Sequence, residues 1–105
     1  MRVLVNVPKR VKRGEPIEVK LLISHPMESG QRRDETGQAV PRQIIHAFRA
    51  AYNGVEVIRL ELHPAIAANP FLSFAAVADQ SGVIELSWED DAGVKQTETA
   101  AVEVI

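Results

Sequence analysis

Short runs of alternating apolar and polar residues fill most of this chain. In the strongest run, residues 17–23, apolar side chains occupy the odd positions, and Glu18 and Lys20 occupy two of the even ones. A period of two is typical of a strand with one face in a core and the other in solvent. Residues 2–7 repeat the pattern more weakly and end at Pro8, which cannot donate to a strand ladder. Both segments are predicted to be half-buried strands.

Residues 42–52 fit either a helix or a strand. A helical stripe would gather six apolar residues, namely Ile44, Ile45, Ala47, Phe48, Ala51 and Tyr52. One face of a strand would hold Ile44, Phe48, Ala50 and Tyr52 together with His46. The following Asn53-Gly54 pair decides for the strand, because both residues accept the positive φ of a type I′ hairpin turn. The second strand of this hairpin is expected to change face near Ile58, which indicates a β-bulge.

Three further strands are predicted after this hairpin. Residues 71–77 place Leu72, Phe74 and Ala76 inward, and residues 84–88 place Ile84, Leu86 and Trp88 inward. A turn at residues 90–93 precedes a final run that ends near Val104. Residues 63–70 lie between two prolines and are expected to be a connector with at most one helical turn.

About seven strands separated by turn signals, with no convincing helix, indicate an all-β protein. The favoured architecture is an immunoglobulin-like antiparallel β-sandwich, although the Cys and Trp signature of antibody domains is absent. A small β-barrel is the structural alternative. Residues 1–105 have a uniform density of apolar residues and a length typical of one domain, so a single domain is expected.

Composition and charge exclude several classes of function. The sequence has no cysteine, which rules out disulfides, thiolate metal sites and a thiol nucleophile. Its net charge is −2, with mixed signs along the chain, so neither nucleic acid nor a membrane surface is an expected partner. No apolar run approaches the roughly 20 residues of a membrane helix. The basic residues 9–13 and the acidic residues 89–91 are both interpreted as solvated turns.

No catalytic site, metal site or cofactor is predicted. Three histidines are present, His25, His46 and His63, but their spacing matches no ligand pattern. Ser24 beside His25 lacks the strand-turn-helix elbow that exposes a nucleophile. The chain is therefore expected not to be an enzyme, and a metal site around His25, Glu28 and His63 is the weakest of the functions considered.

The least generic stretch is the polar loop of residues 23–34, Ile-Ser-His-Pro-Met-Glu-Ser-Gly-Gln-Arg-Arg-Asp. It contains a proline and a glycine, so it must run across the surface, and it extends to Gln38. Long loops in small domains tend to be functional or disordered. The loop is therefore either a simple strand connection or a contact surface for another macromolecule.

The sequence resembles the SoxZ family of sulfur-oxidation carrier subunits over nearly its whole length. The most specific motifs are His-Pro-Met-Glu at residues 25–28 and Ala-Asn-Pro at residues 68–70. The other matching pieces are residues 7–9, 14–20, 22–24, 29–32, 34, 37, 41–42, 44–45, 52–54, 71–74, 88, 90–91 and 93.

The resemblance implies a non-catalytic sandwich domain that pairs with a SoxY-like subunit. In this family the partner carries sulfur intermediates of thiosulfate oxidation on a cysteine in a flexible arm, and it presents them to other enzymes. The resemblance also implies the periplasm, where a chain without its own signal peptide would arrive by export with its partner. The alternative is an independent immunoglobulin-like binding module unrelated to sulfur carriage.

Eight residues are predicted to contact the partner or the enzymes that it visits: His25, Met27, Glu28, Arg32, Arg33, Arg42, Asn69 and Phe71. The three arginines offer charge-assisted bonds to carboxylates or to anionic sulfur groups, and Met27 offers an adaptable apolar contact. Equally, these arginines would serve to fix the loop to its own domain. For Phe71 and Trp88, a place in the core is the more frequent outcome.

Overall fold

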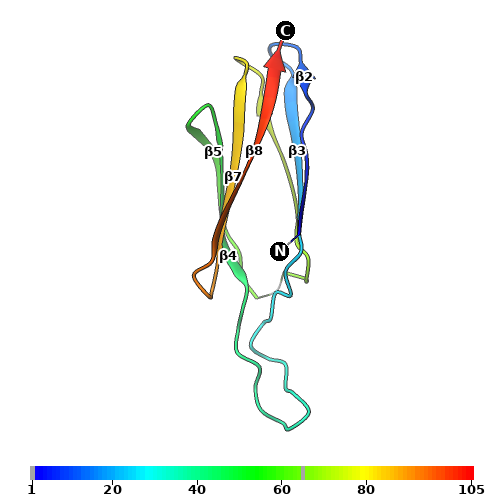
Figure 1. Cartoon of the computed structure of the whole chain (residues 1–105), viewed down its shortest axis with the longest axis vertical. Coiled ribbons are helices and arrows are strands. Elements are labelled where there is room, and N and C mark those ends of the chain that lie inside the picture. The colour runs from blue at the N-terminus through cyan, green and yellow to red at the C-terminus, as the bar shows by residue number, and fades with distance from the viewer. Residues whose placement is uncertain (1, 65) are drawn as a thin grey trace.

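A computed structural model describes residues 2–64 and 66–105, which form two β-sheets packed as layers (Figure 1). The strands are β1 (Val3–Asn6), β2 (Arg10–Val11), β3 (Pro16–Ile23), β4 (Ile45–Tyr52), β5 (Val55–Glu61), β6 (Phe71–Val77), β7 (Gly82–Asp90) and β8 (Lys95–Val104). One sheet has the order β1-β3-β6 and the other β2-β8-β7-β4-β5. No helix forms in the described part of the chain, and the all-β sandwich prediction is confirmed.

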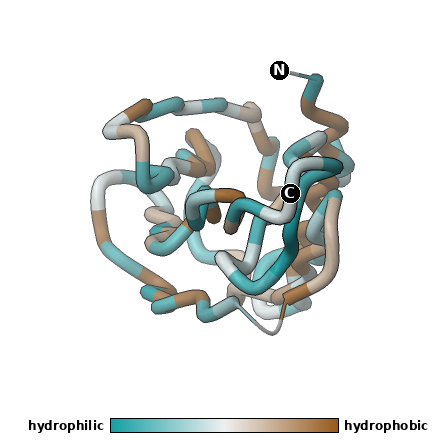
Figure 2. Tube along the Cα trace, turned by 90° about the horizontal axis from the view of Figure 1, so that it is seen from below, coloured by the Kyte–Doolittle hydropathy of each residue, from teal (hydrophilic) through white to brown (hydrophobic). Residues whose placement is uncertain are grey.

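The period of two in the sequence becomes the two faces of each strand. In β3 every second residue is buried, and Ile17, Val19, Leu21 and Ile23 are fully inaccessible. Figure 2, which looks along the long axis, shows apolar and polar positions alternating along the chain. The strand prediction for residues 42–52 is also confirmed, because β4 occupies Ile45–Tyr52 and no helix forms there.

The Asn53-Gly54 hairpin and its bulge are present as predicted. Asn53 has φ 49° and Gly54 has φ 83°, the left-handed values that a type I′ turn requires. The register between β4 and β5 shifts at Ala50 and Ala51, which face Ile58 and Glu56, so Val57 is the extra residue. The change of face near Ile58 in the sequence is therefore a β-bulge.

One strand pairing in this otherwise antiparallel sandwich is parallel. Residues 9–13, interpreted as a solvated turn, contain β2, which pairs in parallel with β8 through Arg10↔Glu103 and Val11↔Val104. The chain leaves one sheet after Pro8 and joins the other, where Val11 is buried. Two residues are too few to show a period, so the alternating pattern could not reveal this strand.

The core lies between the layers and contains the predicted tryptophan. Trp88 is 3% exposed, and the rings of Phe48 on β4 and Phe74 on β6 meet edge to face with centroids 6.2 Å apart. This contact places β6 opposite β4. Phe71, by contrast, is 59% exposed, so the expectation that it is a core residue is wrong.

Residues 63–70 connect β5 to β6. Ala65 lies outside the described residues, so the expected helical turn is tested only at its flanks, where the Ile66 N–H bonds the His63 carbonyl at 3.1 Å. Asn69 ends the connector in a left-handed conformation with φ 54°. Asparagine tolerates this conformation better than most residues do.

Tyr52→Phe is expected to lower the free energy of unfolding by about 1 to 2 kcal/mol, because three partly buried backbone groups lose a shared partner. The Tyr52 hydroxyl accepts N–H bonds from Asp79 at 3.1 Å and Gln80 at 3.0 Å, and it donates to the Gln80 carbonyl. Urea unfolding of the two proteins measures the difference. An unchanged midpoint and slope would show that water replaces the hydroxyl without loss.

Candidate partner-binding site

The long β3–β4 connection, residues 24–44, projects beyond the sandwich at one end of the molecule (Figure 1, lower end). It contributes to an elongated shape of 58 × 20 × 18 Å. Isolated antiparallel bridges join Glu28 to Gln43 and Arg33 to Ala39. The connection is thus an irregular hairpin whose two arms hold each other, rather than a free loop.

The tip of this hairpin is closed by one aspartate. Asp34 Oδ1 accepts bonds from the Thr36 N–H at 2.9 Å, the Thr36 hydroxyl at 2.7 Å and the Gln38 N–H at 3.0 Å. These bonds lower the pKa of the Asp34 carboxyl, the Thr36 hydroxyl bond most of all. An aspartate that binds backbone amides two to four residues on fixes a turn. Gly37 at this turn has φ 85°, a value that glycine adopts without a Cβ clash.

At the base of the hairpin, the two most specific motifs of the sequence bind each other. The His25 N–H donates to Asn69 Oδ1 at 3.0 Å, and the Asn69 N–H donates to the His25 carbonyl at 2.8 Å. His25 and Asn69 are 44 positions apart in the chain. Their reciprocal bonds join the start of the hairpin to the connector that leads into β6.

The His25 ring is buried, with 3% of the residue exposed, and both of its nitrogens are engaged. Nδ1 accepts the Met27 N–H at 3.0 Å, so the ring proton belongs on Nε2, which faces Asp90 Oδ2 at 3.5 Å. Asp90 Oδ1 in turn accepts the N–H groups of Ala92 and Val94, each at 3.0 Å. The buried His25 ring and Asp90 carboxylate, which face each other, therefore connect the hairpin base to the β7–β8 turn.

Met27 completes the hairpin base from the inside. Its side chain is buried, its φ is 50°, and its sulfur lies 3.3 Å from the Ile45 nitrogen at the start of β4. Positive φ costs free energy for a residue with a Cβ and persists where the surroundings impose it. The sulfur is a weak acceptor, and a flexible thioether fills irregular gaps.

A second aspartate, Asp91, ties the returning arm of the hairpin to the sandwich. Arg42 binds it with two parallel bonds, Nε–Oδ2 at 2.8 Å and Nη2–Oδ1 at 2.9 Å. The Ile44 N–H reaches Oδ2 at 3.1 Å, and His46 Nδ1 lies 3.2 Å from Oδ1. The Arg42 bond is the largest of the effects that lower the pKa of Asp91 to about 2.

This carboxylate predicts an acid-sensitive component of stability. The folded pKa of Asp91, about 2, lies below its usual 3.8, so its contribution is complete above about pH 4. As the pH falls from about 4 to 2, the contribution is lost, and we expect about 1 kcal/mol because Arg42 is half exposed. The unfolding free energy of Asp91→Asn, measured across this range, should fall less steeply than that of the wild type. Parallel pH curves would contradict the assignment.

Glu28, Arg32 and Arg33 make their bonds within the hairpin. Arg32 Nη2 lies 2.6 Å from Glu28 Oε1, and its Nε lies 3.1 Å from both carboxylate oxygens, which lowers the pKa of Glu28. Arg33 Nη1 donates to the Gly37 carbonyl at 2.8 Å. Arg32 and Arg33 therefore brace the hairpin internally, and only Arg42 of the three arginines binds a residue of the sandwich. Arg32 and Arg42 remain 60% and 49% exposed at their side chains.

The structure divides the eight predicted contact residues into two groups. Glu28, Arg32, Arg33, Arg42, Asn69 and Phe71 reach the surface, whereas His25 and Met27 are buried. His25 and Met27 hold the hairpin base and expose little surface, and partner contact by these eight residues stays a prediction. The interpretation of residues 89–91 as a solvated turn is also wrong, since Asp90 is 4% exposed and Asp91 binds Arg42.

An exposed apolar row on the three-stranded sheet was missed by the sequence reasoning. Leu4, Leu22 and Phe71 are cross-strand neighbours on β1, β3 and β6, with 59%, 36% and 59% exposed. A cleft of about 220 Å³, lined by Arg2, Leu4, Leu22, Ser24 and Asn69, joins this row to the hairpin base. The signal was present in the sequence, because Leu22 breaks the polar face set by Glu18 and Lys20.

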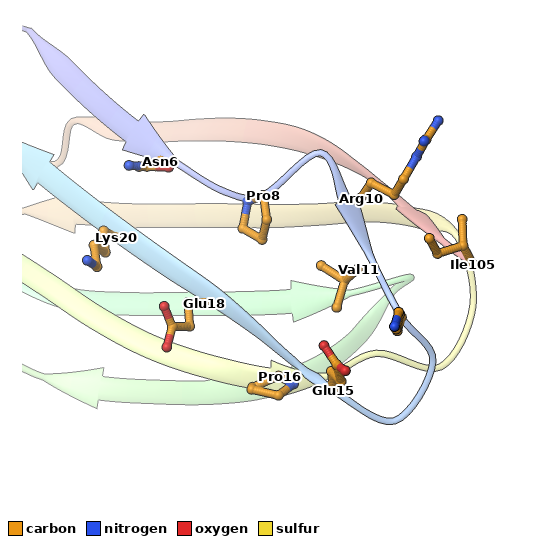
Figure 3. Close-up of a pocket in the computed structure, with 10 residues that line it drawn as sticks. Asn6, Pro8, Arg10, Val11, Glu15, Pro16, Glu18, Lys20 and Ile105 are labelled. Atoms are coloured by element: carbon orange, nitrogen blue, oxygen red, sulfur yellow. The ribbon is translucent and has the colours of Figure 1, made fainter.

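A larger cleft lies at the end of the molecule opposite the hairpin. This cleft of about 590 Å³ is lined by side chains of both charge signs (Figure 3), and Arg10 there pairs with Glu103. In residues 2–64 and 66–105, no three His, Cys, Asp or Glu residues are grouped to hold a metal ion. Nor is any helix of this region long and apolar enough to cross a membrane.

Several solved structures share this fold. A superoxide reductase (neelaredoxin) from Ignicoccus hospitalis matches with a TM-score of 0.73 and 17% identity, covering 100% of this chain and 81% of its own. A putative superoxide reductase from Thermotoga maritima matches with a TM-score of 0.73 and 15% identity, covering 98% and 85%. The sulfur carrier protein SoxY from Chlorobium limicola f thiosulfatophilum matches with a TM-score of 0.67 and 12% identity, covering 98% and 78%. At such low identity these matches establish the fold alone.

Sequence comparison is more specific than the fold. Among curated proteins no sequence matches significantly. The family model of the sulphur oxidation protein SoxZ, however, matches residues 5–101, which is nearly the whole chain. On this match, the chain belongs to the SoxZ family of sulphur oxidation proteins.

Proposed function

We propose that this protein is the non-catalytic subunit of a SoxYZ-type sulfur carrier complex and acts as the scaffold for a SoxY-like subunit. The observation that supports it most is the family membership over residues 5–101. The sequence contains no cysteine, so it offers no thiol on which a sulfur intermediate could be carried. In this proposal the partner carries the intermediate, and this chain holds the partner and helps present it to other sulfur-oxidation enzymes.

The surface is suited to lasting contact with another protein. The hairpin exposes Arg32 and Arg42, each paired with a carboxylate, and the apolar row beside its base exposes Leu4, Leu22 and Phe71. Stable complexes join apolar cores to polar, arginine-containing rims. The hairpin base, fixed by His25 and Asn69, holds these two surfaces in one orientation.

The complex is proposed to work in the periplasm, which rests on the family resemblance. Expression of the untagged chain with and without its partner, followed by periplasmic fractionation, tests this. Recovery from the periplasm only when the partner is present is the expected result. Retention in the cytoplasm under both conditions would contradict it.

The experiment for the proposed function is co-expression with a SoxY-like subunit of the same genome, with a tag on the partner alone. We expect this chain to be retained with the partner at equal stoichiometry through affinity capture and size exclusion. Clean separation at micromolar concentration would overturn the scaffold function and favour an independent binding module.

Arginine variants test whether the hairpin contributes to the contact. Arg32→Ala with Arg42→Ala should weaken partner binding or sulfur turnover, because both guanidinium groups carry charge on the exposed hairpin. Arg10→Ala, at the far end of the molecule, serves as the matched control. Unchanged affinity and unchanged turnover in the double variant would restrict these arginines to fixing the loop.

A further inference from the structure

We infer that β6 is the strand edge at which the partner adds a β-strand, and this inference rests on the proposed function. β6 is the outer strand of the three-stranded sheet and pairs with β3 alone. Its seven residues, Phe-Leu-Ser-Phe-Ala-Ala-Val, include no charged side chain. An apolar edge of this length, without charges or proline, is an open template for another strand.

The free hydrogen-bonding groups of β6 follow from the bonds at its two ends. The Pro70 carbonyl accepts the Ile23 N–H at 3.1 Å, and the Ala78 N–H donates to the Glu15 carbonyl at 2.9 Å, so even-numbered residues face β3. Backbone groups alternate in direction along a strand. The N–H and C=O groups of Phe71, Ser73, Ala75 and Val77 therefore point away from β3, and no hydrogen bond from another described residue reaches them.

The other sheet edges are protected, and β6 is not. β5 carries Glu56, Arg59 and Glu61 and is twisted by the bulge at Val57. β1 has four residues and β2 only two. Charges, bulges and short length are the usual means of preventing edge pairing. In the described part of the chain, β6 is thus the one long edge without such protection.

The packing of the two layers also favours an added strand beside β6. The Phe48–Phe74 contact places β6, the edge of the three-stranded sheet, opposite β4. The five-stranded sheet continues by one more strand, β5, which has no strand of the other sheet opposite it. The inward residues at this side, Ile58 and Leu60 on β5 and Leu72 and Phe74 on β6, are only partly buried. A strand hydrogen-bonded to β6 would lie opposite β5 and cover these residues.

These features define the occupant as an uncharged strand with apolar residues on its inward face, supplied by the SoxY-like subunit. SoxY from Chlorobium limicola shares the sandwich fold, and such a fold is built from strands with one apolar, inward-facing side. Seven paired residues span about 23 Å. The area buried by this ladder alone is smaller than the roughly 800 Å² that each partner buries in a stable complex. The adjoining exposed row of Leu4, Leu22 and Phe71 would enlarge the buried area.

Proline substitution at the free edge tests the inference. Ala75→Pro removes an N–H that points away from β3, so the β3–β6 ladder keeps its bonds. We expect it to weaken binding of the tagged SoxY-like subunit by about 100-fold or more, because the added ladder loses a donor and meets a ring. The matched control is Glu61→Pro at the β5 edge, which should change affinity by less than about threefold. Circular dichroism and melting of each variant check the fold.

Hydrogen exchange of the wild-type complex is the second measurement and needs no variant. The amides of Ser73, Ala75 and Val77 should become protected on binding, while those of Arg59 and Glu61 on β5 should not. If the wild type binds but neither Ala75→Pro nor exchange identifies β6, the inference is overturned and the proposed function stands. If the wild type does not bind at all, the proposed function itself fails. A homodimer dissociated by Ala75→Pro would assign the edge to a second copy and overturn the choice of partner.

Discussion

Trp88→Ala should lower the free energy of unfolding by about 3 to 5 kcal/mol, the range for truncating a buried large aromatic residue. Trp88 is 3% exposed in the middle of β7, and its neighbours Phe48 on β4 and Gln96 on β8 lie in the same cross-strand row. Removal of the indole leaves a cavity that flanking strands cannot close, because each is held by ladder bonds. Urea or thermal unfolding measures the loss.

Trp88→Phe is the matched control for the aromatic volume. The indole Nε1 is buried, and no hydrogen-bond partner for it is present among the described residues. Phenylalanine therefore keeps most of the packing and removes an unpaired donor, so we expect a cost below about 1.5 kcal/mol. Equal losses in the two variants would show that the indole's shape, rather than burial of an aromatic ring, determines the effect. An unchanged melting temperature of Trp88→Ala would reject its place in the core.

His25→Ala should lower the free energy of unfolding by about 2 to 4 kcal/mol, since two buried groups lose their partner. The Met27 N–H loses its acceptor, and Asp90 loses the ring N–H that faces it. The loss should be concentrated at the hairpin base. Hydrogen exchange at Met27 and Asn69 is expected to accelerate more than exchange at β7.

His46→Ala provides the comparison for His25. The His46 side chain is 37% exposed and contacts one oxygen of Asp91, which keeps Arg42 as its main partner. We expect a change below about 1 kcal/mol for an exposed contact of this kind. Equal unfolding free energies for His25→Ala and the wild type would show that the buried network adds no stability to the hairpin.

The regular part of the fold could be predicted because its signals are local. Alternation in residues 17–23 and the Asn53-Gly54 pair each depend on a few neighbouring residues, and both predictions hold. β2 could not be predicted in this way, because its position is set by a parallel partner 93 residues away. Nothing in two residues distinguishes such a strand from a basic turn.

The site could be predicted as a set of residues but not as an arrangement. The loop motif and Asn69 stood out, and they do lie together, yet the burial of His25 was not predicted. The partner that explains its burial, Asp90, looked like part of a solvated turn. Pairing between polar residues far apart in the chain leaves no local sequence pattern. Leu22, by contrast, interrupts the polar face of its own strand, and this interruption is visible in the sequence.

The most direct test of the scaffold function is the solution mass of this chain mixed with a SoxY-like subunit, measured by light scattering after size exclusion at micromolar concentration. The account predicts one peak with the summed mass of one copy of each chain, or a whole multiple of it, containing both chains in equal amounts. Two separate peaks, each with the mass of its own chain alone, would contradict it.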